Sequence, residues 1–420
     1  MKIVFKNKII LLVNSGSLRK KFVLEKIKKL GIVIVCLDDK KKDFALPYVD
    51  YWILADLMNE KECLKVAKEF TVSNPNLHID GAITFWDECI ILTSLLCEKF
   101  NWIGIPYSVS NKIKNKFVFR EFCKKNKLPT PVSKKITNKD LNSIKKMTFP
   151  VVIKPIFGAF SAFVKKINNY DELIKFVAEI NLDKNNFNKE HLWQDWGIMA
   201  EEYIAGNEVD VDLLIQSGKI KYFAITDNHP TVEPYFLETG QNMPSWQSPK
   251  DQKRLLKMTK NVTEAFGVKN ACLHFEAKIT KNGPVPIEIN LRMGGGDVYL
   301  FSKNVWGVDL IENALKVSLG IKTHIIKPKN PLKYLLGEQF LSSQSVVVKK
   351  IKVDEYLKRQ KYIEEIYFEK KESDIFLAPP DGFDSNIGWV TVNGKNPEEC
   401  KKRLAEAKKF IHIETEVYKK

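Results

Sequence analysis

The chain lacks the features that mark cysteine-based folds and membrane proteins. Its seven cysteines are odd in number and form no CxxC pair, so the sequence predicts neither a zinc ribbon nor a disulfide framework. No apolar run reaches transmembrane length, and the lysine-interrupted start does not resemble a signal peptide. We therefore expect a cytoplasmic protein with reduced thiols and no membrane partner.

Acidic residues are in deficit. Lysine and arginine number 67 against 51 aspartate and glutamate residues, which gives a formal net charge of +16. Such an excess raises nucleic acid as a possible partner. The lysines are spread along the chain, however, with no basic tail and no basic patch interleaved with aromatic residues. We interpret the charge as a solvated surface or a biased composition, and we predict no nucleic-acid partner.

Two nucleotide-binding motifs are also missing, namely the phosphate loop GxxxxGK[ST] and the dinucleotide fingerprint GxGxxG. A bound nucleotide would therefore have to be held by lysines from separate elements. The chain contains no convincing Ser, His and Asp or Cys and His arrangement either. This absence argues against a covalent nucleophile on the protein.

The beginning of the chain has a βαβ pattern. An apolar strand at 9–13, a turn at Gly16, a helical pattern to Leu30 and a strand at 32–37 are typical of a doubly wound parallel sheet. Further strands extend this first domain to about residue 112, near 51–54 and 81–85.

The expected secondary structure changes in later segments. From Pro129 onward short strands are separated by glycine or asparagine turns, which indicates an α+β unit. Near residue 330 the pattern shifts again to short strands, and an amphipathic helix follows at 397–410. The sequence thus predicts a small C-terminal α+β domain.

The run from Pro286 to Gly296 carries the strongest chemical signal. If its first part is a strand, the two-residue period places Glu288, Asn290 and Arg292 on one face and packs the alternating isoleucines and leucine on the other. Oxygen ligands from Glu and Asn suit a hard cation such as Mg²⁺, and Arg suits a phosphate or carboxylate. The alternative is a strand edge whose polar residues simply face water.

A second acidic strand favours the metal interpretation. Glu276 lies twelve residues before Glu288, with the turn at 281–284 between them. A hairpin with that turn would bring Glu276 beside Glu288 and Asn290. Two carboxylates on one face repel unless a cation lies between them, so a shared metal ion is the natural resolution.

Two more segments have the character of a nucleotide site. Lys154 ends an otherwise apolar strand, where burial of its charge is costly unless an anion is near. The turn at 157–161 that follows has small residues that could fold over phosphate. Farther on, the backbone at 202–204 could contact an adenine edge, and Glu208 could hold ribose hydroxyls, although a solvated acidic edge would give the same pattern.

Together these residues resemble the ATP-grasp superfamily in their order and spacing, and most closely its carboxylate-amine ligases, the group of L-amino acid ligases and carnosine-synthase-like enzymes. The resemblance covers the chain to about residue 320. It implies an ATP-grasp fold, mixed α/β and α+β, with four parts: a doubly wound pre-ATP-grasp domain at 1–112, a lid subdomain at 113–200, a large subdomain with the metal site at 201–330 and a C-terminal α+β domain at 331–420.

The resemblance also implies roles for individual residues. Lys116 and Lys154 would bind the ATP phosphates under a flexible cover, for which the chain has one glycine where such loops often have several. Arg292 would stabilise the transferred phosphoryl group or the acyl phosphate. The other implied ATP contacts are Phe157, Gly158, Ser161, Glu201, Glu202, Ile204 and Glu208. The implied metal ligands, for one or two Mg²⁺ ions with Mn²⁺ as an option, are Glu276, Glu288 and Asn290.

Two segments are candidates for the substrate end. Backbone amides of Gly294, Gly295 and Gly296 could approach an anionic substrate without a side chain in the way, unless they form only a tight turn. The stretch at 233–244 is similar to the substrate-facing segment of the ligases, so Glu238 and Gln241 are expected in the pocket.

The implied reaction joins a small carboxylate, such as an amino acid, to an amine through an acyl phosphate, with release of ADP and phosphate. An ATP-grasp carboxylase or purine-pathway-type ligase is an alternative, although the chain has no Met-Lys-Met biotin-attachment motif. A non-catalytic nucleotide or nucleic-acid binding protein is a third hypothesis, suggested by the charge alone. The oligomeric state stays open, with a homodimer as one option because dimers are common in that superfamily.

Overall fold

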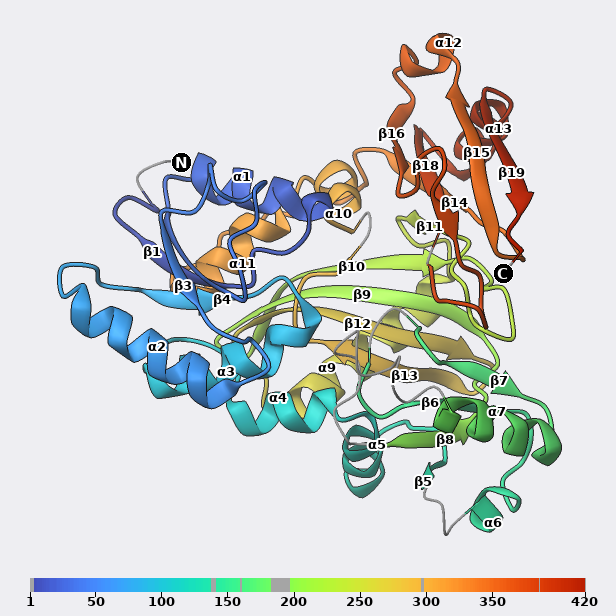
Figure 1. Ribbon diagram of the computed structural model, residues 1–420, viewed down its shortest axis with the longest axis horizontal. Helices are drawn as coiled ribbons and strands as arrows, with labels where there is room; N and C mark the ends of the chain where they lie inside the picture. The colour runs from blue at the N-terminus through green and yellow to red at the C-terminus, as the bar shows by residue number, and fades with distance from the viewer. Residues whose placement is uncertain are drawn as a thin grey trace.

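The computed structural model describes residues 4–136, 141–158, 161–182, 197–295, 298–384 and 386–419. These residues form four β-sheets. In Figure 1 the N-terminal sheet lies to the left of a large central sheet, a small antiparallel sheet lies below it, and the C-terminal elements rise above it. Within the described residues no helix is long and apolar enough to cross a membrane.

The N-terminal sheet is parallel and has the order β3-β2-β1-β4, as the doubly wound prediction requires. Its first strand is buried along most of its length because parallel sheets are covered on both faces. The strands are β1 (Ile9–Val13), β2 (Val33–Asp38), β3 (Tyr51–Leu54) and β4 (Gly81–Ile83). The helices of this part are α1 (Lys21–Lys29), α2 (Glu60–Ser73), α3 (Ile90–Lys99), α4 (Tyr107–Lys114) and α5 (Lys116–Lys125), with short 3-10 turns η1 (Leu18–Lys20) and η2 (Asp87–Cys89).

The small antiparallel sheet has the order β5-β8-β6-β7. Its central strands bury an apolar cluster against its longer helix. The strands are β5 (Ser133–Ile136), β6 (Val151–Pro155), β7 (Lys165–Ile167) and β8 (Ile198–Glu202), and the helices are α6 (Leu141–Ile144) and α7 (Tyr170–Leu182).

The large sheet has eight strands in the order β13-β12-β9-β10-β11-β14-β18-β16, so it contains strands from both sides of residue 330. Its strands are β9 (Asn207–Gln216), β10 (Lys219–Asn228), β11 (Gly240–Met243), β12 (Ala271–Thr280), β13 (Gly283–Asn290), β14 (Tyr334–Phe340), β16 (Ile363–Phe368) and β18 (Gly388–Gly394). The helices α9 (Pro249–Ala265), α10 (Val298–Trp306) and α11 (Leu310–Ser318) accompany it.

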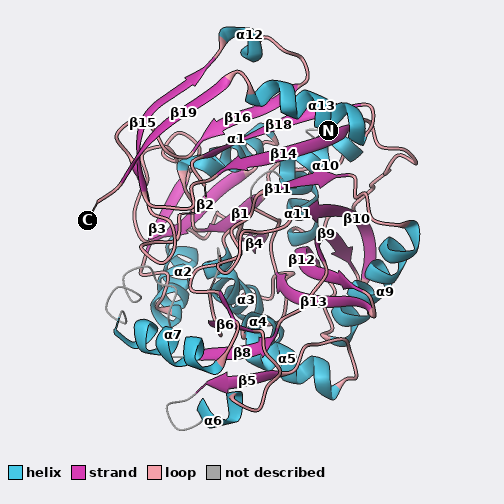
Figure 2. Ribbon diagram, turned by 90° about the vertical axis from the view of Figure 1, so that its right-hand side faces the viewer, coloured by secondary structure: helices cyan, strands magenta, loops and turns pink. Residues whose placement is uncertain are grey.

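The C-terminal part adds a three-stranded sheet in the order β17-β15-β19, next to the end of the large sheet at the top of Figure 2. Its elements are β15 (Val346–Val353), α12 (Glu355–Lys358), β17 (Ile375–Phe376), α13 (Pro397–Lys408) and β19 (Ile411–Val417). The predicted amphipathic helix at the end of the chain is α13, which buries Cys400, Leu404 and Ala407.

The predicted hairpin is present as β12 and β13, with Glu276 directly opposite Glu288. A register shift follows at Glu276 and Ala277, where the β13 partner changes from Glu288 to Pro286. The shift leaves Ile287 as an extra residue, as in a β-bulge. Ile289 therefore packs in the apolar core as predicted, whereas Ile287 lines the pocket instead.

Candidate active site

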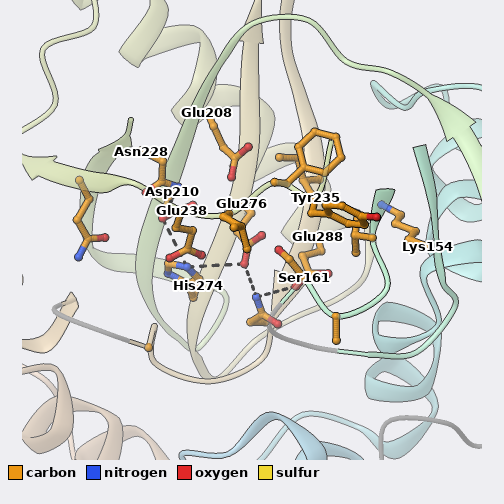
Figure 3. Close-up of a pocket in the computed structure, with 18 of the residues that line it drawn as sticks. Lys154, Ser161, Glu208, Asp210, Asn228, Tyr235, Glu238, His274, Glu276 and Glu288 are labelled. Atoms are coloured by element: carbon orange, nitrogen blue, oxygen red, sulfur yellow. Dashed lines mark hydrogen bonds and ion pairs between the residues drawn. The ribbon is translucent and has the colours of Figure 1, made fainter. Parts of the chain in front are cut away.

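A pocket lies between the small antiparallel sheet and the large sheet (Figure 3). Lys154 enters it from β6, while Glu208, Glu276 and Glu288 enter from three adjacent strands of the large sheet. Residues of the N-terminal and C-terminal parts complete its wall, the latter including Trp389 of β18. The pocket thus gathers side chains from all regions of the chain.

The three predicted metal ligands come together in this pocket. The Nδ2 atom of Asn290 donates hydrogen bonds to Glu276 Oε1 at 2.8 Å and to Glu288 Oε1 at 3.1 Å. Burial, and then the charge of Glu288, raise the pKa of Glu276 well above its ordinary value. The repulsion between the two carboxylates, which raises the pKa of Glu276, is the situation that a bound cation relieves.

Lys116 lies against the same carboxylates. Its Nζ atom is 2.9 Å from Glu288 Oε2 and donates to the carbonyl of Gly158 at 2.9 Å. Burial acts to raise the pKa of Glu288, but the ammonium groups of Lys116 and Lys114 hold it far below its ordinary value. Burial likewise acts to lower the pKa of Lys116, yet Glu288 keeps it above the ordinary value. Both groups are therefore charged at neutral pH.

Lys154 lies beside an anion, as its position at the end of an apolar strand predicted. It forms an ion pair with Glu201, whose other oxygen accepts a hydrogen bond from Arg120 Nε at 2.9 Å. All three side chains are buried. Burial lowers the pKa of Lys154 to about 8 against the opposing charge of Glu201. Burial acts to raise the pKa of Glu201, but Arg120 and Lys154 hold it at about 2.

The ion pairs of the Lys154, Glu201 and Arg120 triad limit how Glu201 could make the predicted contact with a nucleotide. Its side chain is committed to Lys154 and Arg120, and its backbone lies in β8 between β5 and β6. Glu202 is also tied down, since its Oε2 atom accepts a hydrogen bond from Val132 N at 2.9 Å. Both residues line the pocket, and their contact with a nucleotide stays a prediction.

The remaining nucleotide candidates lie where β8 leads into β9. Ile204 and Glu208 line the pocket, and Glu208 Oε2 is 3.6 Å from Lys278 Nζ. Lys278 also lies over the rings of Tyr203 and Phe236, 5.4 and 5.7 Å from their centroids. This corner therefore offers a carboxylate beside flat aromatic surfaces.

The predicted phosphate cover is only partly described. Gly158 and Ser161 line the pocket, with φ angles of +156° and +53°. Phe157 is not among the lining residues. Residues 159 and 160 lie outside the described part of the chain.

Arg292 reaches the pocket from the segment after β13. Its Nε atom is 3.5 Å from Asp87 Oδ1, and its Nη1 atom donates to the Met293 carbonyl at 3.1 Å. Asp87 also pairs with Lys114. Burial acts to raise the pKa of Asp87, but Lys114 and Arg292 hold it below its ordinary value. The N-terminal part thus fixes the guanidinium at the pocket wall.

The predicted substrate residues occupy the other end of the pocket. Glu238 and Gln241 line it, and Glu238 Oε2 accepts a hydrogen bond of 3.4 Å from Gln339. Gly295 lines it as well, with open space where a Cβ atom would lie. A Cβ atom on Gly294 would instead lie 2.7 Å from His274 Nδ1. Gly296 lies outside the described residues.

Sequence reasoning missed a polar cluster next to the metal candidates. The imidazole of His274 lies 2.9 Å from Asp212 Oδ1 and 3.6 Å from Asp210 Oδ2. Burial acts to lower the pKa of His274, but the two aspartates raise it to about 10. Burial raises the pKa of Asp210 to about 7, with His274 opposing. The signal was available, because His274 is two residues before Glu276 and hence on the same strand face.

The cation site must be judged from its donor set. In the described part of the chain, no group of three or more His, Cys, Asp or Glu side chains is arranged to hold a metal ion. The set found here has two carboxylates and an amide whose Nδ2 atom donates to both of them. With an ion bound, the Oδ1 atom of Asn290 would face it instead, and carboxylate and amide oxygens suit Mg²⁺. The raised pKa of Glu276 is consistent with that fit.

The fold is that of ATP-grasp proteins, and part of the chain matches their family model. Residues 147–299 match the family model described as an ATP-grasp domain. Carnosine synthase 1 of Gallus gallus is 27% identical over 349 residues, which cover 80% of this chain and 38% of that protein. The chain spans about two fifths of the length of the carnosine synthases it matches.

Smaller relatives are similar as well. Alanine--anticapsin ligase of Bacillus subtilis strain 168 is 23% identical over 316 residues, covering 69% of this chain and 65% of that protein. The crystal structure of an L-amino acid ligase from Bacillus licheniformis superposes with a TM-score of 0.80 at 21% identity, covering 99% of this chain and all of that one. That likeness supports the fold over the whole chain.

Proposed function

We propose that this chain is an ATP-dependent carboxylate-amine ligase that forms an amide bond between an amino acid, or a similar carboxylate, and an amine. One observation carries the proposal. The pocket holds two lysines, Lys116 and Lys154, together with the Glu276, Glu288 and Asn290 cluster, and Lys116 pairs with Glu288. Such an arrangement can hold the phosphates of a nucleotide on one side and a cation on the other.

The nucleotide would lie between the two sheets. Lys154 and Lys116 would contact its phosphates, with Gly158 and Ser161 over them. Its base would lie at Ile204 against the aromatic surfaces near Lys278, and its ribose at Glu208. Within the described residues no backbone hydrogen bond engages the amide of Ile204, which leaves that donor for a base nitrogen.

Mg²⁺, or Mn²⁺ in its place, would be held by Glu276, Glu288 and Asn290, as one ion or two. When bound, such an ion supplies positive charge that neutralises the phosphoryl oxygens. The chain's own residues position the reactants around it. Glu288 keeps Lys116 in place, and Asp87 holds Arg292 toward the pocket.

The reaction would proceed in two displacements. A carboxylate oxygen of the first substrate attacks the γ-phosphorus of ATP, and the bond from that phosphorus to ADP breaks. The amine nitrogen of the second substrate then attacks the acyl carbon, loses a proton, and inorganic phosphate leaves. Arg292 would stabilise the negative charge of the phosphoryl group in both steps. No side chain becomes covalently modified.

The relatives support this class of substrates. Their names describe enzymes that join alanine to anticapsin or act as L-amino acid ligases. Glu238, Gln241 and Gly295 would face the substrates at the end of the pocket away from Lys154. We infer two small-molecule substrates, a carboxylate and an amine.

The test is incubation of the purified chain with ATP, Mg²⁺ and pairwise pools of amino acids. We expect ADP and phosphate to form only when two substrates are present, together with a mass equal to their sum less one water. AMP and pyrophosphate would contradict the acyl phosphate. ATP hydrolysis that needs bicarbonate instead of an amine would favour a carboxylase. The variant Glu288→Gln is the matched negative control.

A further inference from the structure

The pocket has a cation at its substrate end that the proposed reaction does not use. Arg19, from the turn after β1, lines the pocket together with Trp389 of β18. Its guanidinium carbon lies 4.4 Å from the centroid of the Trp389 ring. The contact joins residues 370 positions apart in the sequence, so the two ends of the chain meet at this point.

Trp389 is held as a rigid platform for this guanidinium. It is 5% exposed, its Nε1 atom donates to Glu365 Oε2 at 2.7 Å, and its ring stacks on Tyr367 with a centroid distance of 4.6 Å. A guanidinium over an aromatic face keeps the N–H groups in its own plane free for other acceptors. The stacking therefore orients Arg19 without consuming its hydrogen-bond donors.

The N–H groups of the Arg19 guanidinium have no close carboxylate partner in the described part of the chain. The nearest carboxylate oxygen is Glu369 Oε2, which lies 3.7 Å from Nη1, too far for a hydrogen bond. Both side chains are partly exposed, at 33% for Arg19 and 42% for Glu369. Within the described residues the Arg19 guanidinium donates no hydrogen bond. By contrast, Lys116 and Lys154 each form an ion pair with a carboxylate of the pocket.

A neighbouring group also lacks a partner. Asn386 is 3% exposed and lines the same end of the pocket. Its Nδ2 atom donates to Gln339 Oε1 at 3.1 Å, but its buried Oδ1 atom has no hydrogen-bond partner among the described residues. A buried carbonyl oxygen is costly to leave unpaired. This end of the pocket therefore offers both N–H donors and an acceptor to a polar ligand.

We propose that Arg19, stacked on Trp389, is the residue that binds the free carboxylate of an amino acid acceptor. The inference rests on the proposed ligase function and adds the residue that selects the acceptor. The carboxylate that becomes activated must reach the phosphates near Arg292. A carboxylate held by Arg19 instead stays unreacted, which assigns it to the acceptor.

The experiment compares acceptors with and without that carboxylate. The full chain is supplied with ATP, Mg²⁺ and one fixed donor, and its acceptors are the twenty L-amino acids and the matching L-amino acid amides. Arg19→Gln should raise the KM for amino acid acceptors roughly tenfold to a hundredfold, the range of one charge-assisted bidentate contact. Its KM for the amides, for ATP and for the donor should match the wild type. Arg19→Lys should fall between the two.

A matched control separates recognition from docking of the two ends of the chain. Glu369→Gln removes the carboxylate that lies 3.7 Å from Arg19, so its KM for amino acids should stay equal or fall. If Glu369→Gln raises that KM as Arg19→Gln does, Arg19 serves the contact between the chain ends and the inference is overturned. A KM increase for dicarboxylate donors instead of acceptors would overturn it as well.

The two levels of the proposal fail differently. If the wild-type chain forms no amide with any donor and acceptor, the ligase function fails and the acceptor assignment fails with it. If the wild type turns over and Arg19→Gln has unchanged kinetics with amino acids, only the role of Arg19 is overturned. Melting temperatures of all variants check that the substitutions leave the fold intact.

Discussion

The two ends of the pocket differ in how their charges are held. At the end with Lys154, Glu201 and Glu288, each charged group faces an opposite charge from a neighbouring strand or helix, and all are largely buried. At the other end, the contacts of the charged groups Arg19 and Glu238 are 3.7 and 3.4 Å long, and their partners come from distant parts of the chain. The first end is tightly paired and the second is loosely paired.

This difference has a chemical meaning. Charges fixed in advance stabilise a developing negative charge without reorganisation, which suits phosphoryl transfer. Loosely held polar groups on loops can pair with an incoming molecule, which suits selection of substrates. The comparison predicts that substitutions at the tightly paired end reduce turnover or stability, whereas those at the loosely paired end change KM.

The largest expected effect is that of Glu288→Gln. The variant keeps the shape of the side chain but removes the charge that faces Lys116 and the proposed cation, so kcat should fall roughly 10³-fold or more. Phosphate release measures it, and circular dichroism checks the fold. Glu238→Gln is the matched control at the loosely paired end and should retain most of its kcat. Similar losses in both variants would erase the distinction between the ends.

Glu201→Gln should cost stability more than any change at the loosely paired end. It leaves Arg120 and Lys154 buried without their shared carboxylate, which is expected to lower the free energy of unfolding by about 3–5 kcal/mol. Urea denaturation measures the change. The exposed pair Lys349 and Glu416 provides the control, since Glu416→Gln should leave the urea midpoint nearly unchanged. A stable Glu201→Gln variant would show that the triad is dispensable for folding.

Two adjacent glycines, Gly294 and Gly295, test the comparison within one short segment. A Cβ atom on Gly294 would lie 2.7 Å from both His274 Nδ1 and Val298 Cγ2, so Gly294→Ala should destabilise by about 1–3 kcal/mol. A Cβ atom on Gly295 meets nothing within 4 Å, so Gly295→Ala should keep its melting temperature. If substrate uses that space, Gly295→Ala should raise a substrate KM. Equal melting temperatures for the two variants would contradict the packing argument.

The smallest expected effect is a pH dependence of ATP binding. Burial lowers the pKa of Lys154 to about 8, so its ammonium is lost as the pH rises through 8. If that charge binds phosphate, the Kd for ATP should be about tenfold weaker at pH 9 than at pH 7. Calorimetry with saturating Mg²⁺ measures it. Lys154→Arg stays charged and should show a flat profile; a slope equal to that of the wild type would exclude Lys154 as its origin.

The titration of Lys154 affects the stability of the fold in the opposite direction from its effect on ATP binding. The folded pKa of Lys154 lies below its ordinary value of 10.5, so the unfolded chain binds more protons between pH 8 and 10.5. Lys154 therefore adds stability as the pH rises through that window. Weaker ATP binding at pH 9 would thus not come from unfolding caused by Lys154.

Sequence reasoning reached the parts of the site that depend on short-range rules. The twelve-residue spacing of Glu276 and Glu288 around a turn predicted their pairing in a hairpin, and the structure confirms it. The β-bulge beside this pair was not predictable, so the inward position of Ile287 was missed. Strand alternation holds only while the register is regular.

Contacts between residues far apart in the sequence were the other feature that could not be predicted. Arg120 meets Glu201 from 81 positions away, and Arg19 meets Trp389 from the opposite end of the chain. Neither pair has a local pattern that announces it, because the contact exists only once separate sheets have packed together. The ATP-grasp fold itself was accessible because several motifs occur in a fixed order.

The eight-stranded sheet limits how this protein could be rebuilt from parts. β11 and β14 are hydrogen-bonded neighbours, although residue 330 separates them along the chain. A chimera that exchanges the segment after residue 330 would thus replace half of a hydrogen-bonded strand pair and place a foreign edge against β11. Grafting a new acceptor preference would succeed more readily if β11, β14 and β18 were transplanted as one block, with the N-terminal turn that carries Arg19 matched to it.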